Sequence, residues 1–393
     1  MTGRAARRAF PTLESVADAP FVMGVAAPHG QTGAESATLL GEGCDVTDLN
    51  SSMADNRAAD LPRRKLAVVI LTWNGREDTL ACLESLESAG HPKEGEAVVV
   101  VDNGSTDDTL EAVEGRFPWV VTLQNGANLG FAGGNNAGIE WALERGYAYV
   151  MLLNNDTQVP EGALEALLAF LEAHPEDGGV QPLLVRHHDR DRIDSMGVEL
   201  FTLPGARDRA IGRPVEKAPE APEEVFGVCA AAALYRSEAL REAGLLDEDF
   251  FILLEDVDLC FRIRLAGYGF HLVPSVRILH KRGISSQGKL SGEKRYLLHR
   301  NINALAVRYW PARHLLMYAP FLVKGWAWGL TAASRTGRRS EWASLMRRSR
   351  AMRREFKGNP LWREIQRRWM RPLGLGYYPR KLLEKFGGPP AIP

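Results

Sequence analysis

The fold of this chain is decided by four apolar segments that alternate with helical ones: LAVVILT (66–72), EAVVVVD (96–102), WVVTLQ (119–124) and YAYVMLLNND (147–156). Continuous runs of apolar and β-branched residues are typical of strands that are buried on both faces. Each run is followed by a segment of helical period, and the last of these helices begins near Pro160, a residue that suits a helix start. This alternation predicts βαβ units and a parallel sheet.

Polar residues follow three of these strands where each strand ends: Thr72-Trp73-Asn74, Asp102-Asn103 and Asn154-Asn155-Asp156. Ligands of open α/β sheets bind beyond the carboxyl ends of the strands, so we expect the three groups to face one crevice. A carboxylate such as Asp102 can accept hydrogen bonds from a ribose or a base, although it also suits a turn before Asn-Gly. Asp156 alone could hold a diphosphate-bound divalent cation, or it could belong to an Asx turn that caps the next helix.

The segment NLGFAGGNNAG (128–138) is rich in glycine and leads into a helix. A dinucleotide-binding GxGxxG loop follows the first strand of its unit, whereas this segment follows the third strand and has a different spacing. Nicotinamide binding is therefore disfavoured. The segment predicts either a loop that approaches a ligand closely or a tight connection.

The next region, about 180–282, is less regular. We expect a strand that runs into a helix at 225–236, a helix that ends at Gly267 and a short strand at 270–274 that leads to His280. Glu255, Asp256 and Asp258 form a carboxylate cluster, which suits a helix start but could also supply a base for a substrate hydroxyl. His280 could complete a metal site or be a surface residue.

Composition restricts the class of protein. The 393 residues are 45% hydrophobic and 25% charged, as in an ordinary soluble globular protein, which excludes collagen-like, wholly disordered and multi-pass membrane chains. The four cysteines are far apart, so neither a zinc knuckle nor a disulfide scaffold is predicted and a reducing compartment is favoured. No apolar segment follows the N-terminal arginines, so no signal peptide is expected.

Charge is distributed unevenly along the chain. Residues 335–371 hold 13 Lys and Arg against three acidic residues, an excess of +10. Because the net charge of the whole chain is −1, the remaining residues carry a net charge of −11. This basic segment predicts contact with an anionic partner, either a membrane surface or a nucleic acid. The nucleic-acid alternative would be supported by salt-dependent retention of DNA or RNA.

Taken in order, six motifs closely resemble family 2 glycosyltransferases, and the nearest likeness is to bacterial rhamnosyltransferase-like members: LTWNG (71–75), VVVDNGSTDDT (99–109), NLGFAGGNNAGI (128–139), LLNNDT (152–157), CAAAALYRSEAL (229–240) and FFILLEDVDLCFRIRLAGY (250–268). The resemblance covers about 66–310. It implies an α/β GT-A fold with a mostly parallel central sheet, and transfer of a sugar such as rhamnose from a nucleotide-diphosphate donor with inversion.

The resemblance also implies roles for individual residues. Asp256 matches the general base, and Asp156 matches the last acid of the metal-binding Asp-x-Asp motif, with His280 matching a histidine that joins the metal in some members. We expect the donor to contact the following residues: Thr72, Asn74, Asp102, Asn135, Asn136, Asn155 and Glu255. The motif reads Asn-Asn-Asp here, with one carboxylate, and Asn135 stands where many members have Arg. The expected cofactor is Mg²⁺ or Mn²⁺.

Three parts of the chain are predicted: a disordered leader (1–61), a GT-A domain (62–300) and a helical basic extension (301–393). Translation could also begin at Met53. Residues 315–333 are almost wholly apolar, but Pro320 and Lys324 interrupt them, so we favour a segment in the membrane interface over a spanning helix or a buried cap.

The expected partners are a nucleotide-diphosphate sugar, a glycan or lipid-linked acceptor and an anionic membrane, with no nucleic acid. The expected location is the cytoplasmic face of the cell membrane, where the chain would assemble a cell-surface polysaccharide. An inactive nucleotide-sugar-binding protein is the remaining alternative.

Overall fold

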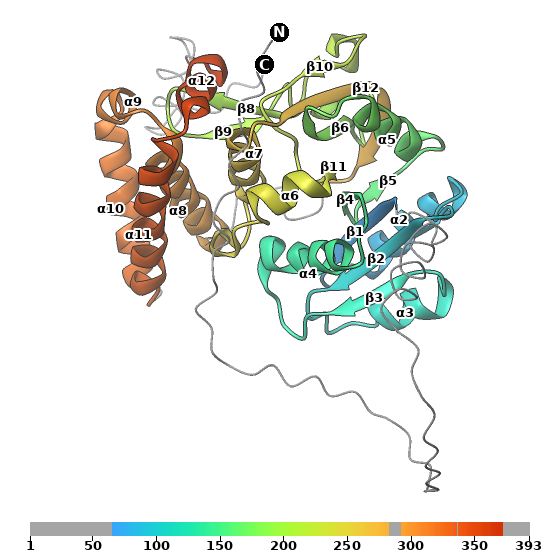
Figure 1. Ribbon diagram of the computed structural model, residues 1–393. Coiled ribbons are helices and arrows are strands. Elements are labelled where there is room, and N and C mark those ends of the chain that lie inside the picture. The colour runs from blue at the N-terminus through green and yellow to red at the C-terminus, as the bar shows by residue number, and fades with distance from the viewer. Residues whose placement is uncertain (1–64, 283–291, 336, 372–393) are drawn as a thin grey trace, which may run out of the picture. The chain divides into compact units, whose positions relative to one another are not determined.

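A mixed sheet forms the centre of the described part of the chain (Figure 1). The computed structural model describes residues 65–282, 292–335 and 337–371, so the predicted leader lies outside the described residues. The main sheet has the strand order β10-β12-β6-β11-β4-β1-β2-β3. Its first half along the chain contains β1 (Leu66–Thr72), α2 (Arg76–Ser88), β2 (Glu96–Asp102), α3 (Thr109–Arg116), β3 (Val121–Gln124), α4 (Gly130–Glu144) and β4 (Tyr149–Asn154).

The four predicted strands are confirmed as a parallel group. β1 pairs in parallel with β2 and β4, and β2 pairs in parallel with β3. All but one of the seven residues of β1 are buried, as expected for a strand that is covered on both faces. Alternate residues of β1 contribute to different cores: Val68 lies with α2, α3 and α5 (Ala163–Ala173), whereas Val69 lies with α4 and the later helices.

The glycines of α4 allow this helix to pack closely on the sheet. A Cβ atom at Gly138 would lie 2.3 Å from Val69 Cγ1, and one at Gly134 would lie 2.5 Å from Leu71 Cδ1. The glycine-rich segment is therefore mostly helix, and its small residues serve contact with the strands. This favours the tight-connection alternative over a ligand-binding loop of the dinucleotide type.

The second half of the sheet is more regular than the sequence predicted. This part of the chain contains β5 (Thr157–Gln158), β6 (Asp177–Arg186), β7 (Ile193–Ser195), β8 (Val198–Phe201), β9 (Ala206–Asp208), η1 (Val215–Lys217), β10 (Glu223–Glu224), β11 (Ala232–Arg236), α6 (Ser237–Ala243), η2 (Glu248–Phe250), α7 (Glu255–Leu265) and β12 (Gly269–His280). β8 and β9 are not in the main sheet; they pair with each other in a small separate sheet. β11 is antiparallel to both β4 and β6, whereas β12 runs parallel to β6. The expected short strand is thus the start of a 12-residue strand, and a register shift between Val273 and Arg277 accommodates Pro274.

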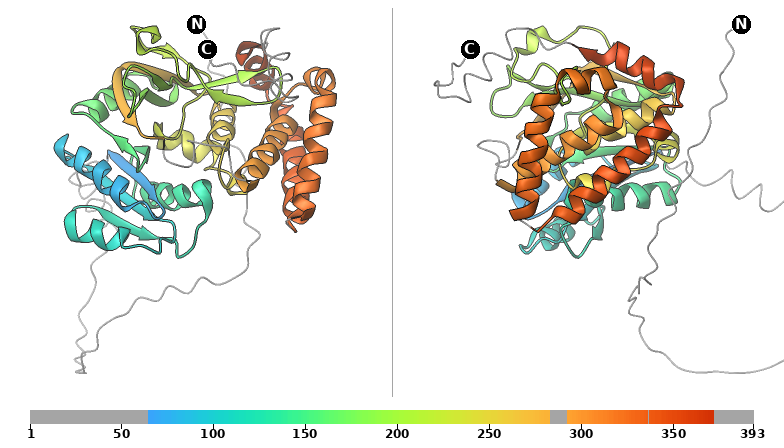
Figure 2. Two further views of the ribbon diagram at one scale, coloured as in Figure 1. Left: turned by 180° about the vertical axis from the view of Figure 1, so that it is seen from behind. Right: turned by 90° about the vertical axis from the view of Figure 1, so that its left-hand side faces the viewer.

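Among the residues described after the sheet, five helices occur: α8 (Gly292–Tyr309), α9 (Ala312–Met317), α10 (Ala319–Arg335), α11 (Arg339–Phe356) and α12 (Pro360–Trp369), with β13 (Met370–Arg371) after them. Figure 2 shows them gathered on one side of the sheet. α8 contacts α7 through stacked rings of Phe261 and Tyr309, whose centroids lie 3.9 Å apart. Side chains of α8, α11 and α12 belong to the same apolar core as α4 and α7.

The apolar segment 315–333 forms the end of α9 and most of α10. Leu316, Met317 and Val323 are exposed, whereas Gly329 and Ala333 are buried. The segment is therefore only partly covered by the rest of the protein. Across the described ranges we find no helix that is both long enough and apolar enough to cross a membrane.

Candidate active site

The three predicted polar groups lie at neighbouring strand ends. Thr72 of β1 is in register with Asp102 of β2, and Leu71 of β1 is in register with Asn154 of β4. The sequence argument from parallel strands is therefore confirmed for this edge of the sheet. It is the edge at which ligands of open α/β sheets bind.

Two groups of hydrogen bonds order the β1 and β2 ends of this edge. The Thr72 and Thr79 hydroxyl oxygens lie 2.8 Å apart, and Asn155 Nδ2 donates to Thr79 Oγ1 at 3.1 Å. Both carboxylate oxygens of Asp102 accept from the backbone N–H of Ser105 at 3.2 Å. Asn74, whose φ is 50°, accepts from the N–H of Thr106 at 2.8 Å. These bonds tie the loop after β2 to the β1 end, and Asp102 stands as an acceptor at the last position of β2.

Asn103, the second residue of the polar pair that ends β2, organises the next loop. Its Oδ1 accepts from the Asn125 side chain and from the Leu129 N–H, each at 3.1 Å. Its Nδ2 donates to the Gly130 carbonyl oxygen at 3.0 Å. Asn103 therefore joins the end of β2 to the start of α4. Its position beside Asp102 was the only available signal in the sequence.

Asn135 and Asn136 are buried on α4, and their amides bond within the chain. Asn135 Nδ2 donates to the Phe131 carbonyl oxygen at 2.8 Å. Asn136 accepts from the Leu246 N–H at 3.1 Å and donates to its carbonyl oxygen at 2.9 Å. The Asn136 amide also donates to Glu248 at 3.1 Å, so it holds the loop before η2 against α4. Donor contact by these two residues stays a prediction.

The structure brings Asp156 and His280 together across the sheet edge. His280 Nε2 lies 3.1 Å from Asp156 Oδ1, and His280 Nδ1 lies 2.8 Å from Asp194 Oδ2. Asp194 is fully buried on the short strand β7 and also lies 3.2 Å from Arg282 Nε. Burial lowers the pKa of His280, but the hydrogen bonds that its ring donates to the Asp156 and Asp194 carboxylates outweigh burial and raise the pKa to about 9.

Asp194 is a site residue that the sequence analysis missed. A carboxylate that accepts from one ring nitrogen of a histidine fixes the ring and directs the other nitrogen, a common arrangement behind metal-bound histidines. Here the directed nitrogen faces Asp156. Nothing near Asp194 in the sequence marks it, because its partner His280 lies 86 positions away.

The donor set at this position fits a hard divalent cation bound chiefly through a diphosphate. Such a cation needs only one or two protein carboxylates, because phosphate oxygens and water complete its coordination. Asp156 supplies one carboxylate at the sheet edge, and His280 can supply an imidazole nitrogen once a cation displaces its Nε2 proton. Within the residues that the structure describes, no cluster of three or more Asp, Glu, His or Cys side chains could hold a metal by itself.

The loop before α7 has an unusual backbone conformation. Phe251, Leu253 and Leu254 all have positive φ angles, at 61°, 75° and 72°. Asn301 of α8 holds this loop by donating to the carbonyl oxygens of Phe250, Ile252 and Leu253 at 2.8–3.0 Å. Non-glycine residues in this conformation are costly and persist where the surrounding structure overdetermines them, often at functional sites.

Glu255 and Asp256 follow this loop at the start of α7. Asp256 accepts from the backbone N–H groups of Val257 at 2.8 Å and Ala230 at 3.3 Å. Glu255 is buried, and its Oε2 has no hydrogen-bond partner among the described residues. Burial raises the pKa of Glu255 and of Asp256, and neither carboxylate has an ion-pair partner in the described part of the chain to oppose that effect.

Asp258, the third carboxylate of the cluster, has a different environment. It accepts from Arg308 Nη1 at 2.6 Å, from Arg262 Nε at 2.8 Å and from the Tyr309 hydroxyl at 2.8 Å. Burial raises its pKa, but the charges of Arg308 and Arg262 outweigh this and lower it. Asp258 therefore joins α7 to α8, and its oxygens are committed to that contact.

The mostly parallel central sheet and its strand order are those of the GT-A fold. A crystal structure of GalNAc-T7 with UDP, GalNAc and Mn²⁺ is similar to this chain with a TM-score of 0.54 and 16% identity. The match covers 77% of this chain and 59% of that chain. At this identity the likeness shows the fold alone, and it agrees with the predicted α/β architecture.

Sequence comparison identifies the family. The model described as "Glycosyl transferase family 2" matches residues 67–244. An N-acetylglucosaminyl-diphospho-decaprenol L-rhamnosyltransferase of Mycobacterium tuberculosis H37Rv is 30% identical over 56% of this chain and 77% of that protein. A dTDP-rhamnosyl transferase, RfbF, of Shigella flexneri is 23% identical over 56% of this chain and 69% of that protein. The chain belongs to glycosyltransferase family 2, as the motifs predicted.

Proposed function

We propose that this chain is an inverting glycosyltransferase that moves a sugar of the rhamnose type from a nucleotide-diphosphate donor to a lipid-linked glycan acceptor. The observation that carries the proposal is the half-buried Asp256 carboxylate at the start of α7, which no arginine or lysine neutralises within the described residues. A carboxylate with a raised pKa suits the acceptance of a proton from a substrate hydroxyl. The names of the two rhamnosyltransferase relatives support the choice of sugar and the lipid-linked acceptor.

In this mechanism, the strand ends hold the donor. Asp102 accepts from the ribose or base, and Thr72, Asn74 and Asn155 line the same edge. Glu255 and the α4 asparagines complete the predicted donor contacts. Asp156 and His280 would hold Mg²⁺ or Mn²⁺ on the diphosphate, where the cation would neutralise charge on the leaving group.

Asp256 would then accept the proton of the acceptor hydroxyl while its oxygen attacks the anomeric carbon from the face opposite the diphosphate. One proton moves to Asp256, the new glycosidic bond forms, and the bond to the diphosphate breaks with its electrons on phosphate oxygen. Inversion follows from this single displacement. We further propose that the chain works at the cytoplasmic face of the cell membrane in the assembly of a cell-surface polysaccharide.

A donor panel tests the function. The full chain is incubated with Mn²⁺ and with dTDP-, UDP- or GDP-linked sugars, first in a thermal-shift assay and then with a polyprenyl-diphosphate-linked sugar as acceptor. We expect one donor to raise the melting temperature, because a ligand that binds only the folded state stabilises it. We also expect a product with inverted anomeric configuration by NMR. Retention of configuration, or donor binding without any transfer, would contradict the proposal.

A further inference from the structure

A cationic pocket lies between α9, α11 and α12, away from the residues assigned to catalysis. Five basic side chains line it: Arg313, Arg353, Lys357, Arg363 and Arg367. The pocket has a volume of about 510 Å³, and no carboxylate is among its lining residues. Such a concentration of like charge is unfavourable by itself and favours a bound anion.

The pocket has an ordered floor. Arg353 Nη1 donates to the carbonyl oxygens of Val307 and Trp310, each at 2.8 Å, and Gln366 donates to the Tyr309 carbonyl oxygen at 2.6 Å. These bonds satisfy carbonyl groups at the C-terminal end of α8, which would otherwise disfavour an anion.

Donors remain available around this floor. Arg313, Lys357, Arg363 and Arg367 form no ion pair with any described residue. Trp362, which also lines the pocket, is more than nine-tenths buried, and its Nε1–H has no acceptor among the described residues. The pocket thus presents several cations without an ion-pair partner among the described residues, and charged donors of this kind recognise phosphate.

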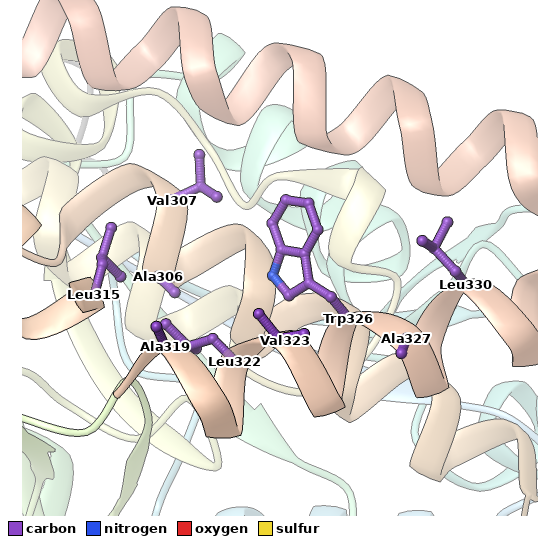
Figure 3. A pocket seen from close by; sticks show the side chains of 9 residues that line it. All are labelled: Ala306, Val307, Leu315, Ala319, Leu322, Val323, Trp326, Ala327 and Leu330. Carbon is purple, nitrogen blue, oxygen red and sulfur yellow. The ribbon is translucent and has the colours of Figure 1, made fainter. Parts of the chain in front are cut away.

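An apolar groove lies beside the pocket, between α8, α9 and α10 (Figure 3). It has a volume of about 430 Å³, and its nine lining residues are all apolar: Ala306, Val307, Leu315, Ala319, Leu322, Val323, Trp326, Ala327 and Leu330. Figure 3 shows these side chains coming from helices on both sides of the groove. Val323 is 67% exposed and the neighbouring Leu316 is 76% exposed, so the apolar surface continues outside the groove.

The pocket and the groove are adjacent. Arg313 of α9 lines the pocket and Leu315 of the same helix lines the groove, so both features border α9. Val307 lines the groove, and its carbonyl oxygen accepts from Arg353 of the pocket. An occupant that suits both has an anionic group at one end and a hydrocarbon chain at the other.

We propose that the pocket and groove bind an anionic membrane lipid, with its phosphate among the five basic side chains and its chain along the groove. The charge of the pocket is complementary to the phosphate, and the groove is complementary to the chain. A nucleic acid would use the cations but would leave the adjacent apolar surface uncovered. This proposal goes beyond the proposed transferase function and does not depend on it, because lipid binding is measured without donor or acceptor.

Vesicle binding by the full chain tests this site. Vesicles of phosphatidylcholine alone are compared with vesicles that also contain phosphatidylglycerol, in flotation assays. The variant Arg363→Gln/Arg367→Gln removes two pocket charges from exposed positions on α12. The matched control Arg339→Gln/Arg347→Gln removes two charges from exposed positions on α11 outside the pocket.

We expect the pocket variant to bind anionic vesicles about thirty-fold more weakly, since each cation near an anionic surface contributes roughly fivefold. The control should lose less than about threefold. Val323→Ser should also weaken binding several-fold, because it removes an exposed apolar contact of the groove. Unchanged melting temperatures would verify that all variants fold.

Three outcomes would overturn the proposal. An equal loss in the pocket and control variants would show diffuse attraction by the basic segment. Displacement of the protein from vesicles by inorganic phosphate would show a site for the free anion, and preferential retention on DNA or RNA would show a nucleic-acid surface.

Donor-dependent transfer to a short-chain soluble acceptor is measured in parallel. It should be unchanged in the pocket variant, so failure of lipid binding and failure of the proposed transferase activity remain distinguishable.

Discussion

Carboxylates lie both at the start of α7 and at the contact between α7 and α8, but the two places surround their carboxylates with different partners. Asp258 is surrounded by Arg262, Arg308 and Tyr309, and its pKa is lowered. Asp256, two residues earlier, is half-buried and lacks such partners, and its pKa is raised. The same short acidic segment therefore contains Asp258, which connects two helices, and Asp256, which can accept a proton.

This difference shows that burial alone does not identify a catalytic carboxylate. What separates the two groups is the number of cations and donors that face each one. For Asp256 the surrounding groups are backbone N–H donors and the negative charge of Asp208, which also raises its pKa. The following predictions use substitutions that keep shape and change only charge or proton acceptance.

The largest effect is expected for Asp256→Asn. An amide keeps the shape of the carboxylate but cannot accept the proton, so transfer should fall about 10²–10⁴-fold. Donor affinity should be nearly unchanged, because the diphosphate is predicted to be held at Asp156 and His280. Steady-state transfer rates and donor titration check this. A variant that keeps more than about a tenth of the wild-type rate would show that Asp256 is not the base.

The next largest effect is expected for Asp258→Asn, and it concerns stability. Removing one partner of a buried ion pair costs about 3–5 kcal/mol, because Arg262 and Arg308 would lose a neutralising charge. Urea unfolding of the two Asn variants side by side measures the contrast. If Asp258→Asn folds as stably as the wild type and yet loses transfer, the roles of the two carboxylates are reversed.

A smaller effect is expected for Asp194→Asn. Asp194 accepts from His280 Nδ1 and thereby orients the ring toward Asp156. Loss of such a supporting carboxylate commonly weakens metal affinity by about 10–100-fold. The Mn²⁺ concentration at half-maximal transfer should therefore rise by that factor, while transfer at saturating Mn²⁺ recovers.

Two comparisons complete the metal test. Asp156→Ala should remove the metal-dependent activity, whereas His280→Ala should leave a metal-dependent remnant, because an imidazole is a poor ligand for a hard cation. Transfer that continues unchanged in EDTA would contradict the assignment of a metal to this site.

Sequence reasoning located the parallel half of the fold because its strands are continuous apolar runs, as in LAVVILT (66–72). It did not locate β6, because the strand begins with Asp177 and two glycines and contains Gln181 and Pro182, which have low strand propensity. The strand end Asn154–Asp156 was placed correctly beside β1. The sequence could not predict contacts between residues that are far apart along the chain. The environment of Asp194 depends on its contact with His280, and that of Asp258 on its contact with Arg308, 50 positions along the chain.

The smallest effect concerns pH. Burial raises the pKa of Asp256 to about 6, and the base acts only when it is ionised. The transfer rate should therefore fall as the pH decreases through about 6, by about tenfold per unit below it. An Asp of ordinary pKa would retain activity down to about pH 4. A pH–rate profile with saturating donor measures this decrease of the transfer rate at low pH. A profile that stays flat to pH 4.5 would contradict the raised pKa.

The most direct test of the contrast between the two carboxylates is a titration of both in one sample. Protein labelled with ¹³C at the aspartate carboxyls is followed by NMR, and the Asp256→Asn and Asp258→Asn variants assign the two signals. The account predicts that the Asp256 signal titrates well above the ordinary value for an aspartate. It predicts that the Asp258 signal stays that of the ionised form until the protein unfolds in acid. An Asp256 signal that titrates at or below the Asp258 signal would contradict the account.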